Sequence, residues 1–259
     1  MRLSWLPALA LVALLPPPDV QNVPAASPIT VSAAVSVTDA LTSIGNDYAS
    51  AAHGPVRFNF GASNVLARQI ANGAPVDLFV SADEAQMDVV AQAGLIADGA
   101  RIDLLGNQLA VVVPSDRPRT LTGIRDLTDA SFKRIAIGDP AAVPAGVYAR
   151  QFLEKQGLWS ELSPRIVPTG SVRAALSAVE SGAADAAIVY RTDARVALRA
   201  TVAWVVPAAL GPRIVYPAAV VRTSTHAAEA RRFLDYLRGA SAARTFERFG
   251  FTVLPSKAP

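Results

Sequence analysis

The 259-residue sequence predicts an α/β fold with mixed, mainly parallel sheets flanked by helices. Three observations support this class. Short apolar runs alternate along the chain with segments whose apolar residues recur at helical spacing. Hydrophobic residues make up 51% of the chain, which is enough for a large core. The length allows one large domain or two small ones.

The first strand is predicted at residues 29–36, "ITVSAAVS", and a helical pattern follows from Val37 to Tyr48. Residues 56–63 predict a second strand and residues 64–73 a short helix closed by a glycine. Residues 76–83 predict a buried strand. A further helix follows it, for which Ser81 and Glu84 have the spacing of a capping box.

The rest of the chain repeats the alternation. Strands are expected at 107–114, 134–140, 184–190 and 216–221, and helices at 145–157, at 171–182 and twice within 227–250. The apolar runs "NQLAVVVP" and "RIVYPAAVV" are candidates for two strands that cross between lobes. With those crossings, the first lobe would hold residues 28–106 plus 216–259 and the second residues 107–215.

The N-terminal segment, residues 1–26, has the features of a secretory signal peptide. Arg2 provides a short positive region, and residues 3–15 are apolar but too short to span a bilayer. Small residues around Ala25 fit a cleavage site. We expect a cleaved signal and a soluble periplasmic protein; an uncleaved anchor is the alternative. The chain has no cysteine, which excludes disulfides, cysteine chemistry and a lipoprotein anchor.

Several function classes are disfavoured by the sequence. The net charge is +3 and the basic residues are scattered, so a nucleic-acid partner is not expected. The chain lacks the G-x-S-x-G, G-x-x-x-x-G-K-[ST] and H-E-x-x-H motifs. Its two histidines, His53 and His226, are expected at the surface. We therefore expect no enzyme and no catalytic residues. A structural or adhesive module is a further alternative, but it would not explain the small and hydroxyl-bearing residues that gather at the strand–helix junctions.

Small and hydroxyl-bearing residues gather where predicted strands and helices meet. These junction residues are Ser36, Ser63, Ala145, Gly146, Ser171, Val172 and Tyr190. Ligands of parallel α/β sheets bind beyond the carboxyl ends of the strands, and helix N-termini there offer free N–H groups. A lone serine before a helix is normally only a cap. The junctions taken together, however, predict an anion site that needs no lysine or arginine.

Six stretches cover nearly all of the mature chain and together carry a family resemblance. They are "ITVSAAVSVTDAL", "SNVLARQIANGAPVDLFVSAD", "LLGNQLAVVVP", "IAIGDPAAVPAGVYA", "VRAALSAVESGAADAAIVYRTDA" and "FERFGF". They resemble the molybdate-binding proteins of bacterial ABC importers. The resemblance implies a two-lobed periplasmic binding protein of type II with a hinge of two crossover strands. It also implies an oxyanion in the cleft, a membrane permease as partner, and no cofactor.

The resemblance implies that five of the junction residues hold the anion: Ser36, Ser63, Ala145, Val172 and Tyr190. Ser36, Ser63 and Tyr190 would donate hydroxyls, and Ala145 and Val172 would donate backbone N–H groups. The metal of molybdate would be contacted only through its oxygens. We also expect Ser36 either to cap its helix or to lie at the junction between strand and helix. Relatives often have more serines before "LARQI"; here the stretch is "GASNV", which keeps Ser63 but loses a neighbouring donor.

The donor-only set favours particular anions. Molybdate and tungstate are fully deprotonated near neutral pH and need donors alone, whereas hydrogenphosphate also needs an acceptor. Sulfate is the main alternative, because it too needs only donors and differs in size. An organic carboxylate would call for an arginine clamp. Arg68 and Arg173 lie inside predicted helices and are expected to reach solvent or a neighbouring acid. We expect a monomer.

Overall fold

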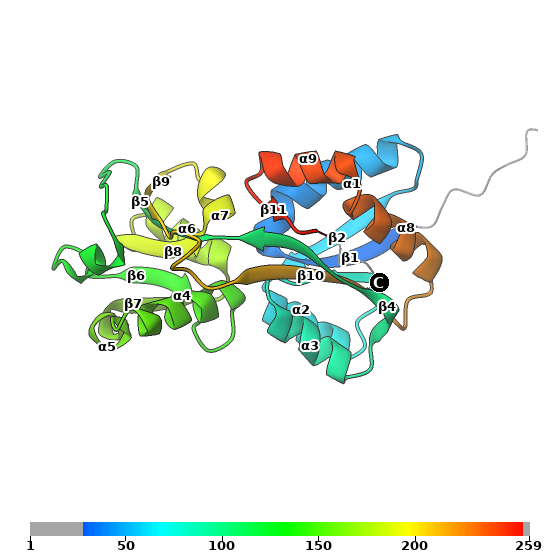
Figure 1. The fold of residues 1–259 in the computed structure, drawn as a ribbon, viewed down its shortest axis with the longest axis horizontal. Helices are drawn as coiled ribbons and strands as arrows, with labels where there is room; N and C mark the ends of the chain where they lie inside the picture. The colour runs from blue at the N-terminus through cyan, green and yellow to red at the C-terminus, as the bar shows by residue number, and fades with distance from the viewer. Residues whose placement is uncertain (1–27, 256–259) are drawn as a thin grey trace, which may run out of the picture.

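The computed structural model describes residues 28–255, so the predicted signal segment, residues 1–26, lies outside the described residues. Two sheets, each flanked by helices, form two lobes arranged along the long axis of the molecule (Figure 1). The predicted two-lobed α/β architecture is confirmed. Between residues 28 and 255 there is no helix long and apolar enough to cross a membrane.

The first lobe is built on a sheet of six strands in the order β11-β4-β10-β3-β1-β2. Their bounds are β1 Ile29–Ala34, β2 Val56–Gly61, β3 Leu78–Val80, β4 Ile96–Asn107, β10 Ile214–Val221 and β11 Thr252–Val253. Strand β1 is parallel to β2 and β3, whereas β10 runs antiparallel to β3 and β4, and β11 antiparallel to β4. Five helices cover this sheet: α1 Thr38–Ser50, α2 Ser63–Ala71, α3 Glu84–Gln92, α8 Ala227–Leu237 and α9 Ala240–Arg248.

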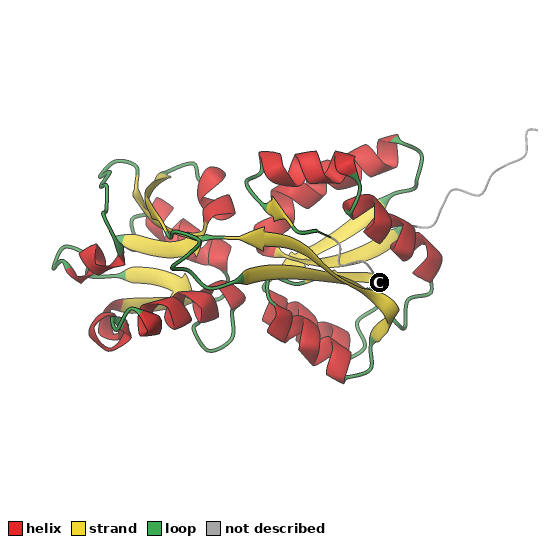
Figure 2. Ribbon diagram, viewed as in Figure 1, coloured by secondary structure: helices red, strands yellow, loops and turns green. Residues whose placement is uncertain are grey.

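The two faces of the first sheet carry separate helix layers, with α1, α8 and α9 on one face and α2 and α3 on the other (Figure 2). Strand β10 lies between them and is buried along its whole length. Tyr216 and Val220 belong to the main core, whereas Ala219 and Val221 belong to the cluster under α2 and α3. This period-two alternation requires apolar residues on both faces, which is why β10 is an uninterrupted apolar run.

The second lobe is built on a sheet of five strands in the order β7-β6-β8-β5-β9. Their bounds are β5 Leu109–Pro114, β6 Ile135–Gly138, β7 Ile166–Thr169, β8 Ala186–Tyr190 and β9 Ala200–Val205. Strand β6 is parallel to β7 and β8, and β5 is antiparallel to β8 and β9. The helices of this lobe are α4 Pro144–Lys155, α5 Trp159–Leu162, α6 Val172–Glu180 and α7 Arg191–Arg195.

The chain passes between the lobes twice, after β4 and before β10 (Figure 1). Both crossings lie next to the apolar runs from which they were predicted. The first of these runs forms β5 of the second sheet, and β4, the long strand that leads into it, was not predicted. Every antiparallel pair involves β5, β9, β10 or β11. The sheets are therefore mixed, as predicted, but with a larger antiparallel share.

One predicted helix cap is wrong. Asp83, rather than Ser81, caps α3, and its Oδ1 accepts from the backbone N–H of Gln86 at 3.0 Å. Ser81 instead donates its hydroxyl to Asp83 Oδ1 at 3.2 Å. Of the two alternatives for Ser36, the second is confirmed: it does not cap α1 but lies at the junction, in the short 3-10 turn η1, Val35–Val37. In both cases a few residues separate the strand from the helix, so the helix begins later in the chain than the predicted cap.

Candidate functional site

All five residues predicted to hold the anion line one pocket, formed between the lobes. Each of them is at most 3% exposed. The complete lining is Ala34, Val35, Ser36, Gly61, Ala62, Ser63, Ala82, Val143, Pro144, Ala145, Val172 and Tyr190. No lining residue carries a charge. The predicted set is thus brought together at one place by residues of both lobes.

The first lobe contributes two serine hydroxyls. Ser63 is the first residue of α2, and its Oγ accepts from the backbone N–H of Ala82 at 2.9 Å. Because that contact uses a lone pair, the Ser63 proton remains available to the pocket. Ser36 Oγ lies 3.0 Å from Tyr216 Oη, a contact in which either oxygen has the geometry of a donor.

The second lobe presents the N-terminus of α4. Pro144 is the first residue of this helix and has no N–H, so the first amide of the helix that can donate is that of Ala145. A Cβ at Gly146 would lie 1.9 Å from the carbonyl oxygen of Gly138. Only a glycine therefore lets α4 begin directly against the end of β6. This close approach places the Ala145 amide in the pocket wall.

The N-terminus of α6 lies in the same wall. Ser171 caps this helix, and its hydroxyl accepts from the backbone N–H of Ala174 at 3.1 Å. The cap leaves the amide of Val172, the first helical residue, without a partner inside the helix. The starts of α2, α4 and α6 each carry about half a positive charge, so together they favour an anion in an otherwise uncharged pocket.

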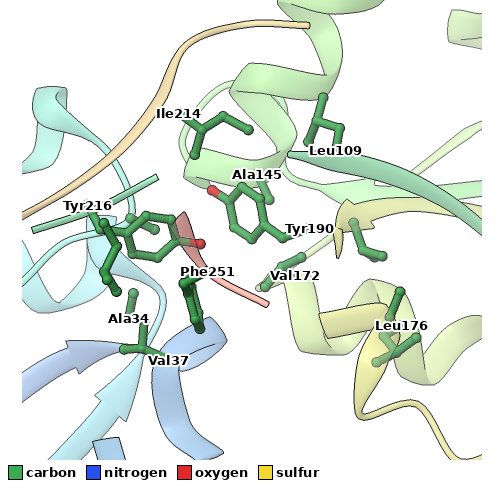
Figure 3. Close-up of a cluster of buried hydrophobic side chains, with 14 of the residues drawn as sticks. Ala34, Val37, Leu109, Ala145, Val172, Leu176, Tyr190, Ile214, Tyr216 and Phe251 are labelled. Atoms are coloured by element: carbon green, nitrogen blue, oxygen red, sulfur yellow. The ribbon is translucent and has the colours of Figure 1, made fainter. Parts of the chain in front are cut away.

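Tyr190 ends β8 with its side chain in the pocket wall. It is 1% exposed, and its hydroxyl has no hydrogen-bond partner within residues 28–255. Burial raises the pKa of Tyr190 well above 10, so the hydroxyl keeps its proton. Figure 3 shows Ala145 and Val172 beside Tyr190, and Tyr216 across from it, with the two tyrosine ring centroids 5.7 Å apart. A buried hydroxyl without a partner costs free energy that a bound acceptor would recover.

The arginines near the junctions behave as predicted. Arg68 is exposed. Arg173 follows Val172 but turns to two acids: its Nη2 lies 2.6 Å from Asp39 Oδ2, and its Nε donates to Asp193 Oδ1. Neither arginine lines the pocket. In the described part of the chain there is also no cluster of His, Asp or Glu fit to hold a metal ion.

The histidines lie outside the pocket lining. His53 is exposed, as expected, and its ring stacks on Tyr48 with centroids 4.8 Å apart. His226 is only partly exposed, because its Nδ1 lies 3.4 Å from Asp77 Oδ1. Its side chain is still 34% exposed, so both histidines lie at the surface, as expected.

The sequence also matches a known protein family. The family model for bacterial extracellular solute-binding proteins matches residues 29–252. The chain belongs to this family. Its members take part in transport by binding a solute and are not enzymes. This solute-binding protein is 40% identical to the molybdate-binding protein ModA of Escherichia coli K12 over 229 residues, which is 87% of this chain and 89% of the relative.

Solved structures support the same fold. The periplasmic molybdate-binding protein of Azotobacter vinelandii matches this solute-binding protein with a TM-score of 0.79 and 28% identity, covering 88% of this chain and 99% of that one. The sulfate-binding protein SubI of Mycobacterium tuberculosis H37Rv matches with a TM-score of 0.74 and covers 87% of this chain and 86% of that one. It is 19% identical, so this likeness concerns the fold alone.

Two groups that contact the site serines were not predicted. The amide of Ala82 donates to Ser63, and the hydroxyl of Tyr216 contacts Ser36. Tyr216 could have been singled out in the sequence, because it carries the one hydroxyl of the apolar run "IVYPAAVV". For Ala82 the sequence holds no signal, because a backbone amide can belong to any residue type.

Proposed function

We propose that this protein captures molybdate or tungstate in the pocket between its lobes and delivers it to the membrane permease of an ABC importer. One observation carries the proposal: Ser36, Ser63, Ala145, Val172 and Tyr190, from both lobes, line a single uncharged pocket. The similarity to molybdate-binding proteins of Escherichia coli and Azotobacter vinelandii supports this choice of ligand.

The proposed contacts suit a fully deprotonated dianion. Three hydroxyls and two amides are available as donors, and no carboxylate faces the pocket. Each hydrogen bond to a charged group contributes about 1.5–3 kcal/mol net. Several such bonds, after the cost of ordering and closure, are consistent with binding of about −8 kcal/mol or stronger, which is micromolar or tighter. The anion is the cargo, and no cofactor is needed to hold it.

Because its contacts come from both lobes, the ligand bridges them and stabilises the closed arrangement, which the permease then recognises. We propose that the first lobe comprises residues 28–106 plus 216–259 and the second residues 107–215. The strands support this division, since those of the first sheet fall within 29–107 and 214–253. They suggest moving the last boundary to Ile214. We further propose that the protein acts as a monomer in the periplasm after loss of residues 1–26.

Calorimetric titration of residues 27–259 with molybdate, tungstate, sulfate and phosphate in one buffer tests the ligand. Tight binding of the first two with weak sulfate binding is the expected result. Tight sulfate binding would replace the proposed ligand with a smaller tetrahedral oxyanion while keeping the site. Binding of none of the four would overturn the function. Small-angle scattering tests closure, and an unchanged radius of gyration at saturating ligand would contradict it.

A further inference from the structure

A chain of hydrogen bonds, partly buried at Asn107 and fully buried between Tyr216 and Ser36, reaches the pocket from the crossing between the lobes. Asn107 is the last residue of β4, and its Nδ2 lies 3.2 Å from Tyr216 Oη and 2.9 Å from Thr192 Oγ1. Tyr216 Oη in turn lies 3.0 Å from Ser36 Oγ. Tyr216 is 0% exposed and Ser36 is 3% exposed. The chain therefore runs from the hinge to a pocket hydroxyl without involving solvent at either hydroxyl.

The direction of this chain follows from donor and acceptor counting. Asn107 Oδ1 accepts from the backbone N–H of Gln108 at 2.9 Å, which fixes the orientation of the amide group. The NH₂ group therefore faces Thr192 and Tyr216, and it can only donate. Tyr216 Oη accepts from Asn107, and its single proton is left for Ser36. Burial also raises the pKa of Tyr216 well above 10, so that proton is retained.

The proton of Ser36 is consequently directed toward the pocket. It has no acceptor at Tyr216, because the tyrosine is itself the donor in that contact. Ser63 accepts in the same way from the backbone N–H of Ala82, so its proton is also left for the pocket. The Tyr190 proton has no partner among residues 28–255. Where a ligand oxygen that carries its own proton meets Ser36 or Ser63, two protons face each other, and one of them becomes a buried donor without an acceptor.

We propose that Tyr216, oriented by Asn107, determines specificity by fixing Ser36 as a donor, so that the pocket favours unprotonated oxyanions over protonated ones such as hydrogenphosphate. This inference rests on the proposed function, because it takes the pocket to be an oxyanion site. Tyr216 and Asn107 are positioning residues that act through Ser36. Neither is among the residues that line the pocket.

The decisive variant is Asn107→Asp, which is nearly isosteric but has two acceptor oxygens. Tyr216 would then donate to Asp at this position, Ser36 would donate to Tyr216, and a lone pair of Ser36 would face the ligand. At pH 8 molybdate and hydrogenphosphate are both dianions, so the added charge weakens both alike and cancels in the ratio of their dissociation constants. We expect this ratio to shift toward hydrogenphosphate by about tenfold or more.

The matched control is the double variant Asn107→Asp/Tyr216→Phe, which keeps the added charge but cuts the chain. Its ratio of molybdate to hydrogenphosphate affinity should lie between those of the wild type and Asn107→Asp, because without the Tyr216 hydroxyl Ser36 can turn either its proton or a lone pair to the ligand. Titration calorimetry with both anions and a thermal melt of each variant provide the readouts. A shift in the double variant equal to that in Asn107→Asp, or a ratio unchanged by Asn107→Asp, would overturn the inference while the proposed function stands. Failure of the wild type to bind any oxyanion would overturn both.

A second route serves if Asn107→Asp does not fold. Tyr216→Phe alone should weaken molybdate binding several-fold, because Ser36 loses the donor that orients it. In a Ser36→Ala background the same substitution should change molybdate affinity by less than about twofold, since its effect passes through Ser36. Equal effects in both backgrounds would show that Tyr216 acts independently of Ser36 and would overturn the inference.

Discussion

Arg173 of α6 and Asp39 of α1 form an ion pair that joins the two lobes, with Arg173 Nη2 2.6 Å from Asp39 Oδ2. The same guanidinium donates through Nε to Asp193, a buried acid of the second lobe. Arg173 is thus held by its own lobe and extended toward the other. Since Val172 precedes it at the pocket wall, the pair lies where closure would bring the lobes together.

Replacing Asp39 by Asn should therefore weaken anion binding without affecting any residue of the pocket. The side chains of Arg173 and Asp39 are 26% and 40% exposed, so the pair contributes only about 0.5–1 kcal/mol to closure. We expect a two- to fivefold loss of affinity, mostly as faster dissociation in stopped-flow measurements.

The control for Asp39→Asn is Glu154→Gln, which removes an ion pair with Arg150, 2.8 Å away within α4. This pair lies inside the second lobe and should leave the dissociation rate unchanged. An equal effect of both variants on dissociation would mean that the Asp39 pair has no special part in closure.

Tyr190→Phe should separate binding from stability. The hydroxyl has no partner within the described residues, so its removal costs the free protein nothing and leaves the melting temperature unchanged or higher. The ligand, however, loses a donor, and its affinity should fall by about 1–3 kcal/mol. Calorimetry and a thermal melt of the ligand-free protein measure the two effects. A lower melting temperature would argue against an unsatisfied hydroxyl.

Ser63→Ala should behave differently from Tyr190→Phe. Its hydroxyl accepts from the buried amide of Ala82, so the substitution removes a ligand donor and also leaves that amide without a partner. Affinity and unfolding free energy should both fall, the latter by about 1–3 kcal/mol. Chemical denaturation of the ligand-free protein is the check. Unchanged stability would mean that another group satisfies the Ala82 amide.

Gly146→Ala should displace the start of α4. The added methyl would meet a backbone oxygen at 1.9 Å, which cannot move as a flexible side chain would. We expect a loss of stability of about 1–3 kcal/mol and a loss of anion binding, because the Ala145 amide moves with the helix. Gly123→Ala is the control, since a Cβ there meets nothing within 4 Å and the backbone is extended. If Gly146→Ala still binds the anion, the close contact between Gly146 and the end of β6 does not position the Ala145 amide.

The position of the pocket could be predicted from the sequence because its parts are local. A strand end, a following helix start and a small or hydroxyl residue between them are all visible within ten residues. The orientation of the hydroxyls could not be predicted. The contact of Ser36 with Tyr216 joins residues 180 positions apart, and Ser63 meets an amide 19 positions away. No local pattern carries such pairings.

Strand β4 illustrates the same limit for the fold. Its sequence "IADGARIDLLGN" breaks the apolar pattern of a strand with acids and an arginine. In the structure these charges have partners from elsewhere in the chain: Arg101 pairs with Asp88, and Asp98 pairs with Arg222. Hydrogen bonds to β10 hold β4 in place, so this strand does not need an apolar periodicity of its own. Its sequence therefore carries too weak a strand pattern to predict it.

The buried carboxyl of Asp193 makes a prediction about pH. Burial raises its pKa from 3.8 to about 7, opposed by Arg173, while Asp39, Tyr190 and Tyr216 are its other titratable neighbours. Between about pH 4 and 7 the folded protein therefore holds a proton that the unfolded chain releases. Stability should fall as pH rises through this window. Asp83, whose pKa is also raised by burial, acts in the same direction.

Asp193→Asn tests this assignment, because Asn can still accept from Arg173 Nε but does not titrate. The melting temperature of the wild type should decrease from pH 5 to pH 8, and the variant should lose most of that decrease. Acids whose pKa is lowered, such as Asp98 and Asp126, change the stability with the opposite sign and only below about pH 4. They therefore do not affect the melting temperature between pH 5 and pH 8. Parallel melting curves for wild type and variant across this range would show that Asp193 stays ionised beside Arg173.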